Sequence, residues 1–171
     1  SFEIFINKVN DAPIASDISV DVNEDTPQII FADFNDIDSD NSSISVVINT
    51  SSQHGLLTVQ GQGFSYYPDS NFIGADFFTY RVFDGFHYSE EATVFIYVQP
   101  ANDPPEISDI EDQQIDEDTI LNINLSATDI DGDQLFYIAD SNDSNSNIII
   151  TGNLLSFEPS SNFNGDISVI V

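Results

Sequence analysis

The sequence contains no cysteine and only two basic residues, and both shortages exclude functions. Without cysteine there are no disulfides, no thiolate nucleophiles and no thiolate metal ligands. Two Lys and Arg against 30 Asp and Glu give a formal net charge of −28. That charge excludes binding to nucleic-acid phosphates and to anionic lipid headgroups, because both need clustered Lys or Arg. No apolar run approaches the roughly 18 residues of a membrane-spanning helix, so we expect no direct membrane contact.

What the sequence does contain is enough apolar material for a folded core. Apolar residues make up 40% of the 171 residues and aromatic residues 12%. This separates the chain from disordered acidic tails, which are poor in both. The uncompensated charge makes the chain repel itself, and divalent cations are the obvious compensation.

The chain repeats itself with a period of about 92 residues. Asn10-Asp11 recurs as Asn102-Asp103, and Glu24-Asp25-Thr26 recurs as Glu117-Asp118-Thr119, at offsets of 92 and 93. The three aspartates of one loop and an Asn-Phe-x-Gly sequence recur at offsets of 93 and 91: Asp36, Asp38 and Asp40 as Asp129, Asp131 and Asp133, and Asn71 to Gly74 as Asn162 to Gly165. Four landmarks in one order predict a tandem repeat.

Short alternating segments predict an all-β fold. Phe78, Tyr80 and Val82 share one face of a strand, and Val94, Ile96 and Val98 share one face of another. Gly61-Gln62-Gly63 reads as a hairpin turn between two strands. Seven short strands in about 92 residues favour an immunoglobulin-like sandwich, with strands at 14–22, 29–31, 44–48, 56–59, 64–67, 77–83 and 93–98.

The repeat predicts three segments. Residues 1–9 match the last strand, because Phe2, Ile4 and Ile6 fall on Val94, Ile96 and Val98 at an offset of 92. We therefore assign residues 1–9 to the final strand of a preceding repeat, residues 10–102 to a complete repeat and residues 103–171 to a truncated one. Residues 166–171 correspond to the start of the sixth strand, and the Ser/Asn-rich stretch 141–147 leaves the fourth strand of the second repeat open.

The ordered set of landmarks resembles the bacterial cadherin-like (VCBS-type) tandem repeats of large secreted adhesins. The residues that carry the resemblance include Val9 to Pro13, Glu24 to Thr26, His54-Gly55, Phe64-x-Tyr66-x-Pro68 and Asp84-Gly85, together with the landmarks above. The resemblance implies tandem immunoglobulin/cadherin-like β-sandwiches, the second one truncated. It also implies a calcium-binding, calcium-rigidified extender or adhesion module on the bacterial cell surface or secreted.

The acidic loop indicates a calcium site. Alternating Asp36, Asp38 and Asp40 bring three carboxylates together when the loop folds. Calcium takes six to eight oxygen ligands in flexible geometry, which suits such a loop. An EF-hand is excluded, because its sixth position would be Asn41 or Gln134 in place of glycine.

Sandwich topology suggests further ligands. We expect Glu24 and Asp25 of one repeat to face the aspartates of the next, with Asn102 and Asp103 between them, which resembles the calcium cluster between cadherin domains. We also expect Asp76 and Asp84 to add ligands from opposite poles, the lower and the upper. The complete set of predicted metal ligands is Asn10, Asp11, Glu24, Asp25, Asp36, Asp38, Asp40, Asp76, Asp84, Asn102, Asp103, Glu117, Asp118, Asp129, Asp131 and Asp133.

Other interpretations stay open at this point. The acids are also typical of plainly solvated loops. Repetition of the same acids at turns argues against a single active site, so we expect no enzyme, and we expect His54 to serve a turn. A carbohydrate-binding accessory module of a secreted polysaccharide-acting protein is the alternative, because Phe77, Phe95 and Tyr97 are expected on an outer face and exposed aromatic rings stack on sugars.

The expected partners follow from these readings. They are neighbouring repeats of the same protein, surface glycans or another cell-surface protein. The unpaired strand at residues 1–9 and the open edge of the second repeat also predict donor-strand self-association by β-augmentation.

Overall fold

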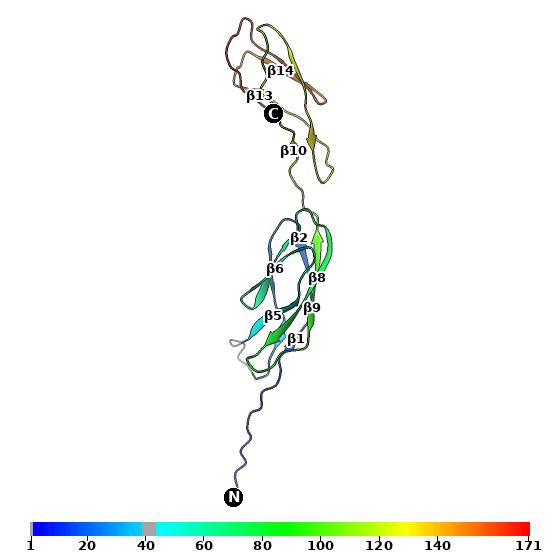
Figure 1. Cartoon of the computed structure of the whole chain (residues 1–171), viewed down its shortest axis with the longest axis vertical. Helices are drawn as coiled ribbons and strands as arrows, with labels where there is room; N and C mark the ends of the chain where they lie inside the picture. The colour runs from blue at the N-terminus through cyan, green and yellow to red at the C-terminus, as the bar shows by residue number, and fades with distance from the viewer. Residues whose placement is uncertain (1, 39–43) are drawn as a thin grey trace. The chain divides into compact units, whose positions relative to one another are not determined.

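The computed structural model describes residues 2–38 and 44–171, and it divides the chain into two compact units. Unit 1 comprises Ser1–Ala101 and unit 2 comprises Asn102–Val171. Every element of the described residues is a strand (Figure 1), and no helix among them is long and apolar enough to cross a membrane. The predicted all-β, immunoglobulin/cadherin-like fold is confirmed.

Unit 1 is a sandwich of two sheets. The larger sheet has the order β2-β9-β8-β5, and the smaller sheet has the order β3-β7-β6. A short pair, β1-β4, closes one end. The bounds are β1 Ile14–Ala15, β2 Ile18–Asn23, β3 Gln28–Phe31, β4 Phe34–Asn35, β5 Ser45–Thr50, β6 Gly55–Gln60, β7 Gly63–Pro68, β8 Gly74–Phe83 and β9 Ala92–Gln99. The seven predicted strand regions are therefore present, with the first divided into β1 and β2.

The alternation read in the sequence fixes the core of unit 1. Val94, Ile96 and Val98 of β9 face inward at 0%, 0% and 3% exposure, while Phe95 and Tyr97 between them are exposed. Phe64 of β7 lies between the two rings of β8, with centroids 4.8 Å from Phe78 and 5.3 Å from Tyr80 in edge-to-face geometry. Such aromatic pairs contribute about 0.5–1.5 kcal/mol each beyond area burial.

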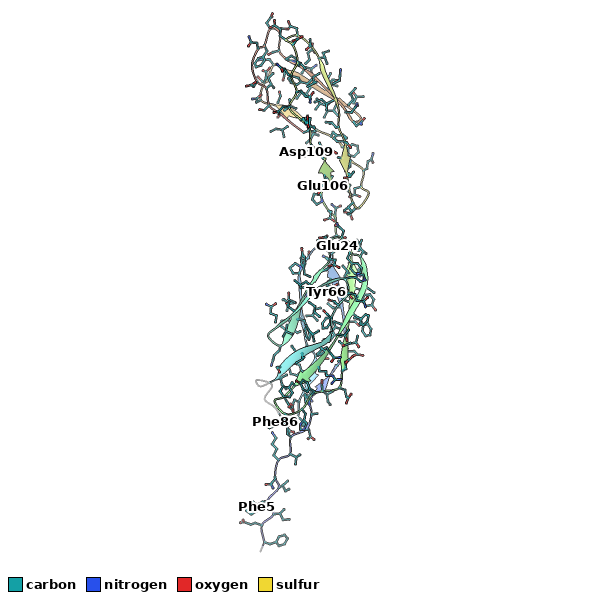
Figure 2. All side chains as sticks on the ribbon, in the orientation of Figure 1. Phe5, Glu24, Tyr66, Phe86, Glu106 and Asp109 are labelled. Atoms are coloured by element: carbon teal, nitrogen blue, oxygen red, sulfur yellow. The ribbon has the colours of Figure 1, made fainter. Side chains whose placement is uncertain are left out.

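The direction of β9 defines the two ends of unit 1. β2 runs parallel to β9, from Ile18 opposite Val94 to Asn23 opposite Gln99, whereas β8 runs antiparallel. We call the end where β2 and β9 start the entry end; it comprises residues 10–17, 33–38 and 84–91. We call the end where they finish the exit end; it comprises residues 23–27, 52–54, 69–76 and 99–101. Glu24 and Phe86, both labelled in Figure 2, lie at the exit and entry ends respectively.

Unit 2 repeats part of this arrangement. Its largest sheet has the order β11-β15-β14, and its core contains Leu125, Leu155 and Phe157. The fourth strand that the sequence left open is present as β14. The bounds are β10 Glu106–Ile107, β11 Leu121–Asn124, β12 Ala127–Thr128, β13 Asp140–Ser141, β14 Asn147–Thr151, β15 Leu154–Glu158 and β16 Val169–Ile170, with β10 paired to β12 and β13 to β16.

Two segments lie outside the strands. Residues 2–13 are in no strand, with Phe2, Ile4 and Ile6 between 74% and 91% exposed. The assignment of residues 1–9 to a preceding repeat stays a prediction. Residues 108–120 of unit 2 are also in no strand, although their counterparts in unit 1 include β2.

Candidate functional site: acidic ends of the two units

At the entry end of unit 1, Asp11 contacts the acidic loop that contains Asp36 and Asp38. The Asp11 amide donates to Asp38 Oδ2 at 2.5 Å, and the Asp38 amide donates to Asp36 Oδ1 at 2.8 Å. Asp36 is 7% exposed. Lys8 donates to the Asp38 carbonyl at 2.6 Å, with its Nζ 3.6 Å from Oδ1. Asp40, the third predicted ligand of this loop, lies outside the described residues.

A second acidic contact at the entry end joins Asn10 to the loop after β8. Asn10 Nδ2 donates to Asp84 Oδ2 at 2.8 Å and lies 3.1 Å from His87 Nδ1. Asp84 Oδ1 accepts the Phe86 and His87 amides, both at 2.6 Å. The hydrogen bond from the His87 amide is the largest influence on Asp84, and with the Asn10 and Phe86 donors it lowers the pKa of that carboxyl to about 2. Asp84 is therefore a carboxylate at any physiological pH.

At the exit end of unit 1, one acid is buried and its neighbour is conformationally unusual. Glu24 is 2% exposed, and its Oε1 accepts the Ala101 amide at 2.8 Å. Asp25 has a φ of 53°, which a non-glycine residue seldom adopts. Its Oδ1 accepts the Asn71 amide at 3.2 Å, while its buried Oδ2 has no hydrogen-bond partner among the described residues. A buried carboxylate oxygen that accepts no hydrogen bond is suited to coordinate a cation.

Asp76 and Asp84 lie at opposite ends of unit 1. Because β8 is antiparallel to β9, its first residues lie at the exit end: Gly74 is opposite Val98. Asp84 follows the last residue of β8 and so belongs to the entry end, where it meets Asn10.

Asp76 is also engaged differently from the other predicted ligands. It is 4% exposed and accepts the amides of Gln53, His54 and Phe77 at 3.1, 2.9 and 2.8 Å. Tyr66 donates its hydroxyl to the same carboxylate at 3.0 Å. Four donors on one side chain indicate that Asp76 holds the turn before β6 in place. His54 belongs to that turn, with its ring stacked on Phe72 at 4.2 Å.

Unit 2 reproduces the contacts of unit 1 at the repeat spacing. The Asp103 amide donates to Asp131 Oδ2 at 2.7 Å, as Asp11 does to Asp38. The Asp133 amide donates to Asp129 Oδ1 at 3.2 Å. The contact between Asp103 and Asp131 therefore recurs at the repeat spacing.

The contacts at the exit end of unit 1 also recur in unit 2. Asp118 has a φ of 60° and its Oδ1 accepts the Asn162 amide at 2.9 Å, matching Asp25 and Asn71. Glu117 is exposed, whereas its counterpart Glu24 is buried. Asn102 Nδ2 donates to the Asp103 carbonyl at 3.0 Å, as Asn10 does to that of Asp11.

Three participants were missed by sequence reasoning. His87 was not identified from the sequence as a neighbour of Asn10 and Asp84. Asn71 and Asn162 were used only as repeat landmarks, and their left-handed conformation with φ of 57° and 55° makes them partners of Asp25 and Asp118. An Asn before Phe-x-Gly in both repeats was the available signal.

The potential metal-ligand atoms at these two ends are of the kind that calcium prefers. Carboxylate and amide oxygens predominate, no cysteine is present and the single histidine at the entry end lies beside Asn10. Calcium prefers such oxygen sets, while zinc and copper prefer nitrogen and sulfur ligands. Some of these carboxylate oxygens already accept hydrogen bonds from backbone amides, as the oxygens of an acidic residue that stabilises a turn do. Calcium binding and turn stabilisation are therefore both open to the same residues.

Comparisons with known proteins agree on the class of fold. The profile described as "Bacterial Ig domain" matches residues 10–97 and again residues 102–171. Curated proteins gave no match. The VCBS-type assignment stays a prediction, while the broader immunoglobulin/cadherin-like repeat is confirmed.

Solved structures give weaker likenesses. Protocadherin gammaB7 EC3-6 is similar at 14% identity and a TM-score of 0.45, over 88% of this chain and 40% of its own. The Yersinia pseudotuberculosis adhesin InvE is similar at 10% identity and a TM-score of 0.35, over 85% and 51%. An endo-fucoidan hydrolase of glycoside hydrolase family 107 is similar at 18% identity and a TM-score of 0.38, over 55% and 17%.

Proposed function

Since the chain belongs to the bacterial Ig domain family, we propose that it is a calcium-binding extender module of a large extracellular or cell-surface protein. Tandem sandwiches of this kind lengthen a surface protein and are usually non-catalytic. The observation that carries the calcium proposal is the duplication of the acidic contacts. Asp11 with Asp38 and Asp103 with Asp131 form the same amide-to-carboxylate bond in both units.

The electrostatics of these ends favour a bound cation. Two carboxylates at about 5 Å repel each other by roughly 3 kcal/mol at an effective dielectric of about 20. Each unit gathers several such groups in a chain with a net charge of −28 and only two basic residues. A divalent cation removes this repulsion, and that gain is what calcium supplies to the fold.

The proposed ligands follow the ends of each unit. Unit 1 offers one set at its entry end and a smaller one at its exit end: Asn10, Asp11, Asp36, Asp38 and Asp84, and then Glu24 and Asp25. Unit 2 offers Asn102, Asp103, Asp129, Asp131 and Asp133, and then Glu117 and Asp118. Asp76 is left out, because four donors already occupy its carboxylate.

A matched pair of double variants in unit 2 tests the site. Asp131→Asn with Asp133→Asn removes two charges from exposed residues, so the core is untouched. We expect calcium affinity, measured by isothermal titration calorimetry, to fall at least about tenfold from a starting Kd of roughly 10⁻⁴–10⁻³ M. Asp109→Asn with Asp112→Asn changes the same charge at exposed residues of the same unit and should leave the affinity within about twofold.

The proposed rigidifying effect of calcium on the chain is measured separately. Small-angle scattering with calcium and with chelator should show a narrower distribution of end-to-end lengths with calcium, and the melting temperature should rise as well. Unchanged scattering, an unchanged melting temperature and no calorimetric heat would contradict the proposed function.

The register of the larger sheet supports carbohydrate binding as a second candidate. Phe77 of β8 is directly opposite Phe95 of β9, and Tyr97 lies two residues further along the same face. All three are 42–48% exposed. Adjacent aromatic rings on one face form an exposed apolar surface on which sugar rings can stack.

This candidate is tested on a glycan array with Phe95→Ala combined with Tyr97→Ala. Loss of a glycan signal that the unchanged chain gives would support it. The matched control is Leu56→Ala with Tyr67→Ala, an exposed pair on the outer face of the smaller sheet. Absence of any glycan signal from the unchanged chain would remove the candidate.

A further inference from the structure

The edge strands of unit 1 differ in how they are protected against pairing with another chain. An edge strand exposes unpaired amide and carbonyl groups, and natural proteins guard it with charged residues, proline or a bulge. In the larger sheet, β2 carries Asp21, and β5 has an irregular register between Ile48 and Thr50. In the smaller sheet, β3 directly follows Pro27. The other edge strand of that sheet, β6 (labelled in Figure 1), has none of these features.

The surroundings of β6 lack charge, although the chain as a whole is strongly acidic. Residues 41–68 contain no Asp, Glu, Lys or Arg, whereas the whole chain contains 30 acidic residues in 171. The edge strand β5 of the larger sheet belongs to the same run and contacts β6. Both edge strands on this side of unit 1 are therefore uncharged.

Unit 2 shows the same feature at the same place in its sheet. Like β6, β14 is an edge strand of a three-stranded sheet and is joined to the inner strand by a two-residue turn that starts with glycine. Residues 144–157, which include β14, contain no charged residue either. The lack of charge therefore follows a position in the fold and is not confined to one stretch of sequence.

Both backbone groups and apolar side chains of β6 are available to a further strand. A two-residue turn joins Gln60 to Gly63, and the hydrogen-bonded pairs of the β6–β7 ladder alternate from there. Leu57 and Val59 therefore turn their amide and carbonyl groups to the open edge, where they meet no partner among the described residues. Val59 faces the sandwich, opposite the buried Phe64, and yet is 48% exposed. A strand beside β6 would pair these groups and cover Val59.

The distribution of charge indicates which partner fits this edge. A basic partner would be drawn to the acidic parts of the surface, and β6 offers it no carboxylate. A second copy of this chain, with its net charge of −28, is repelled least where both copies present an uncharged surface. Two β6 strands that face each other meet this condition. The strand also matches itself, because antiparallel pairing about Thr58 puts Leu57 of each copy opposite Val59 of the other.

We propose that two copies of this chain associate side by side by pairing β6 with β6 in antiparallel direction. The two-fold axis passes through the Thr58 pair, and the two three-stranded sheets become one sheet of six strands. Leu57 and Val59 of each copy exchange backbone hydrogen bonds with Val59 and Leu57 of the other. Because both copies use the same surface, the contact is isologous and closes at two copies. This lateral contact goes beyond the proposed calcium binding, which concerns a single chain.

The first test measures molecular mass against concentration by multi-angle light scattering in chelator. We expect the mass to rise from that of a monomer toward that of a dimer. The rise should come at lower concentration in about 0.5 M NaCl, because salt screens the repulsion between two acidic chains. Thr58→Glu places two carboxylates directly opposite each other across the two-fold axis and should raise the dimer Kd at least about tenfold.

The matched control is Ser65→Glu. Ser65 of β7 lies directly opposite Thr58 and shares its outer face, so this variant adds the same charge one strand further from the edge. Its dimer Kd should stay within about threefold of that of the unchanged chain, because the added charges lie far enough apart to be screened. Circular dichroism of both variants checks that unit 1 is folded.

The second test examines the register through disulfide formation in a glutathione redox buffer. The chain has no cysteine, so each single variant reports one position. Thr58→Cys should give a disulfide-linked dimer on a non-reducing gel, because the Cα atoms of a non-hydrogen-bonded pair lie about 4.5 Å apart. Leu56→Cys changes an exposed residue of the same face and should not, because this register separates the two Leu56 Cα atoms by about 13 Å.

Three results would overturn the proposal. One is a mass that stays monomeric at every concentration up to about 1 mM. Another is equal weakening of the dimer by Thr58→Glu and Ser65→Glu, which would place the contact elsewhere. The third is equal cross-linking of the two cysteine variants, which would contradict the register. None of these results bears on calcium binding, because the chelator removes calcium and the calorimetry of the Asp131 and Asp133 variant tests it separately.

Discussion

At the residue scale, the carboxylates of this chain divide by what their oxygens contact. Asp76 accepts four hydrogen bonds inside unit 1 and belongs to the fold. Asp25 uses one oxygen for Asn71, and the other is buried with no hydrogen-bond partner in the part of the chain that the structure describes, which suits a cation. Both are aspartates beside turns in the sequence. The difference between them depends on neighbours that come from other strands.

Asp76→Asn should lower the free energy of unfolding of unit 1 by about 1–3 kcal/mol. The amide keeps one acceptor oxygen, but its NH₂ group meets backbone amides that are themselves donors, so buried donors lose their partners. Chemical denaturation followed by tyrosine fluorescence measures the change. Asp69→Asn, an exposed aspartate in the same end of the unit, is the control and should shift stability by less than about 0.5 kcal/mol. Equal effects of the two variants would contradict the structural role of Asp76.

The two depressed carboxyl pKa values predict how stability responds to acid. Burial alone would raise the pKa of Asp76, but the amides of Gln53, His54 and Phe77 and the Tyr66 hydroxyl outweigh it and lower that pKa. The pKa of Asp84 is lowered to about 2, chiefly by the His87 amide. A carboxyl with a lowered folded-state pKa stabilises the fold above its unfolded pKa of about 3.9. That stabilisation is lost as the pH falls through the folded-state pKa.

We therefore expect the melting temperature of unit 1 to be nearly constant from pH 7 to about 5 and to fall between about pH 4 and 2. Circular dichroism at each pH measures it in chelator. In Asp84→Asn the fall should be shallower, because one of the two titrating carboxylates is gone. A melting temperature that rises on acidification over this range would show the sign to be wrong.

At the scale of elements, the two glycines of the β6–β7 hairpin differ in how closely a neighbouring strand approaches them. A Cβ on Gly63 would lie 2.5 Å from the Ile30 carbonyl and 3.1 Å from the Phe31 Cα, so β3 can pair with β7 only because the residue is glycine. Gly61, in the turn that joins β6 and β7, has a φ of 62° and open space around it. The two residues are both needed, for different reasons.

Gly63→Ala should destabilise unit 1 by more than Gly61→Ala does. The first change forces β3 and β7 apart, and the second costs only the left-handed conformation, about 1–2 kcal/mol. Urea unfolding gives both values. Gly61→Asn, which tolerates a positive φ, should recover much of the loss at residue 61, whereas no side chain recovers it at residue 63. Comparable losses for the two alanine variants would contradict the close approach.

At the scale of the whole molecule, charge is the dominant feature. A net charge of −28 with a sequence pI near 4.1 means that folding concentrates negative charge in each unit. Mobile ions screen that repulsion over a Debye length of about 10 Å at 0.1 M salt. Calcium at defined ligands acts in addition to screening, so the two contributions are separable.

In chelator, raising the NaCl concentration from about 0.02 to 0.5 M should raise the melting temperature, because screening reduces repulsion. At constant ionic strength, millimolar calcium should raise it further, with about 4–8 °C for each kcal/mol in domains of this size. Magnesium is the control and should give a smaller increase, because it demands octahedral geometry. Identical effects of magnesium and calcium would indicate screening alone.

The sequence by itself determined the repeat, the all-β class, the inward faces of the strands and the acidic composition of the ends. These depend on periods of two and of about 92 residues, which are local or linear properties of a chain. Val94 and Ile96 are buried as their alternation predicted.

Only the tertiary structure decided which carboxylate meets which neighbour. The parallel pairing of β2 with β9 and the antiparallel direction of β8 place Asp76 at the exit end and Asp84 at the entry end. The same packing lets the Asp76 carboxylate bind the turn that contains His54, and it brings His87 next to Asn10. Strand direction and long-range pairing depend on loop closure and core packing across the whole unit, and alternation in the sequence carries no information about either.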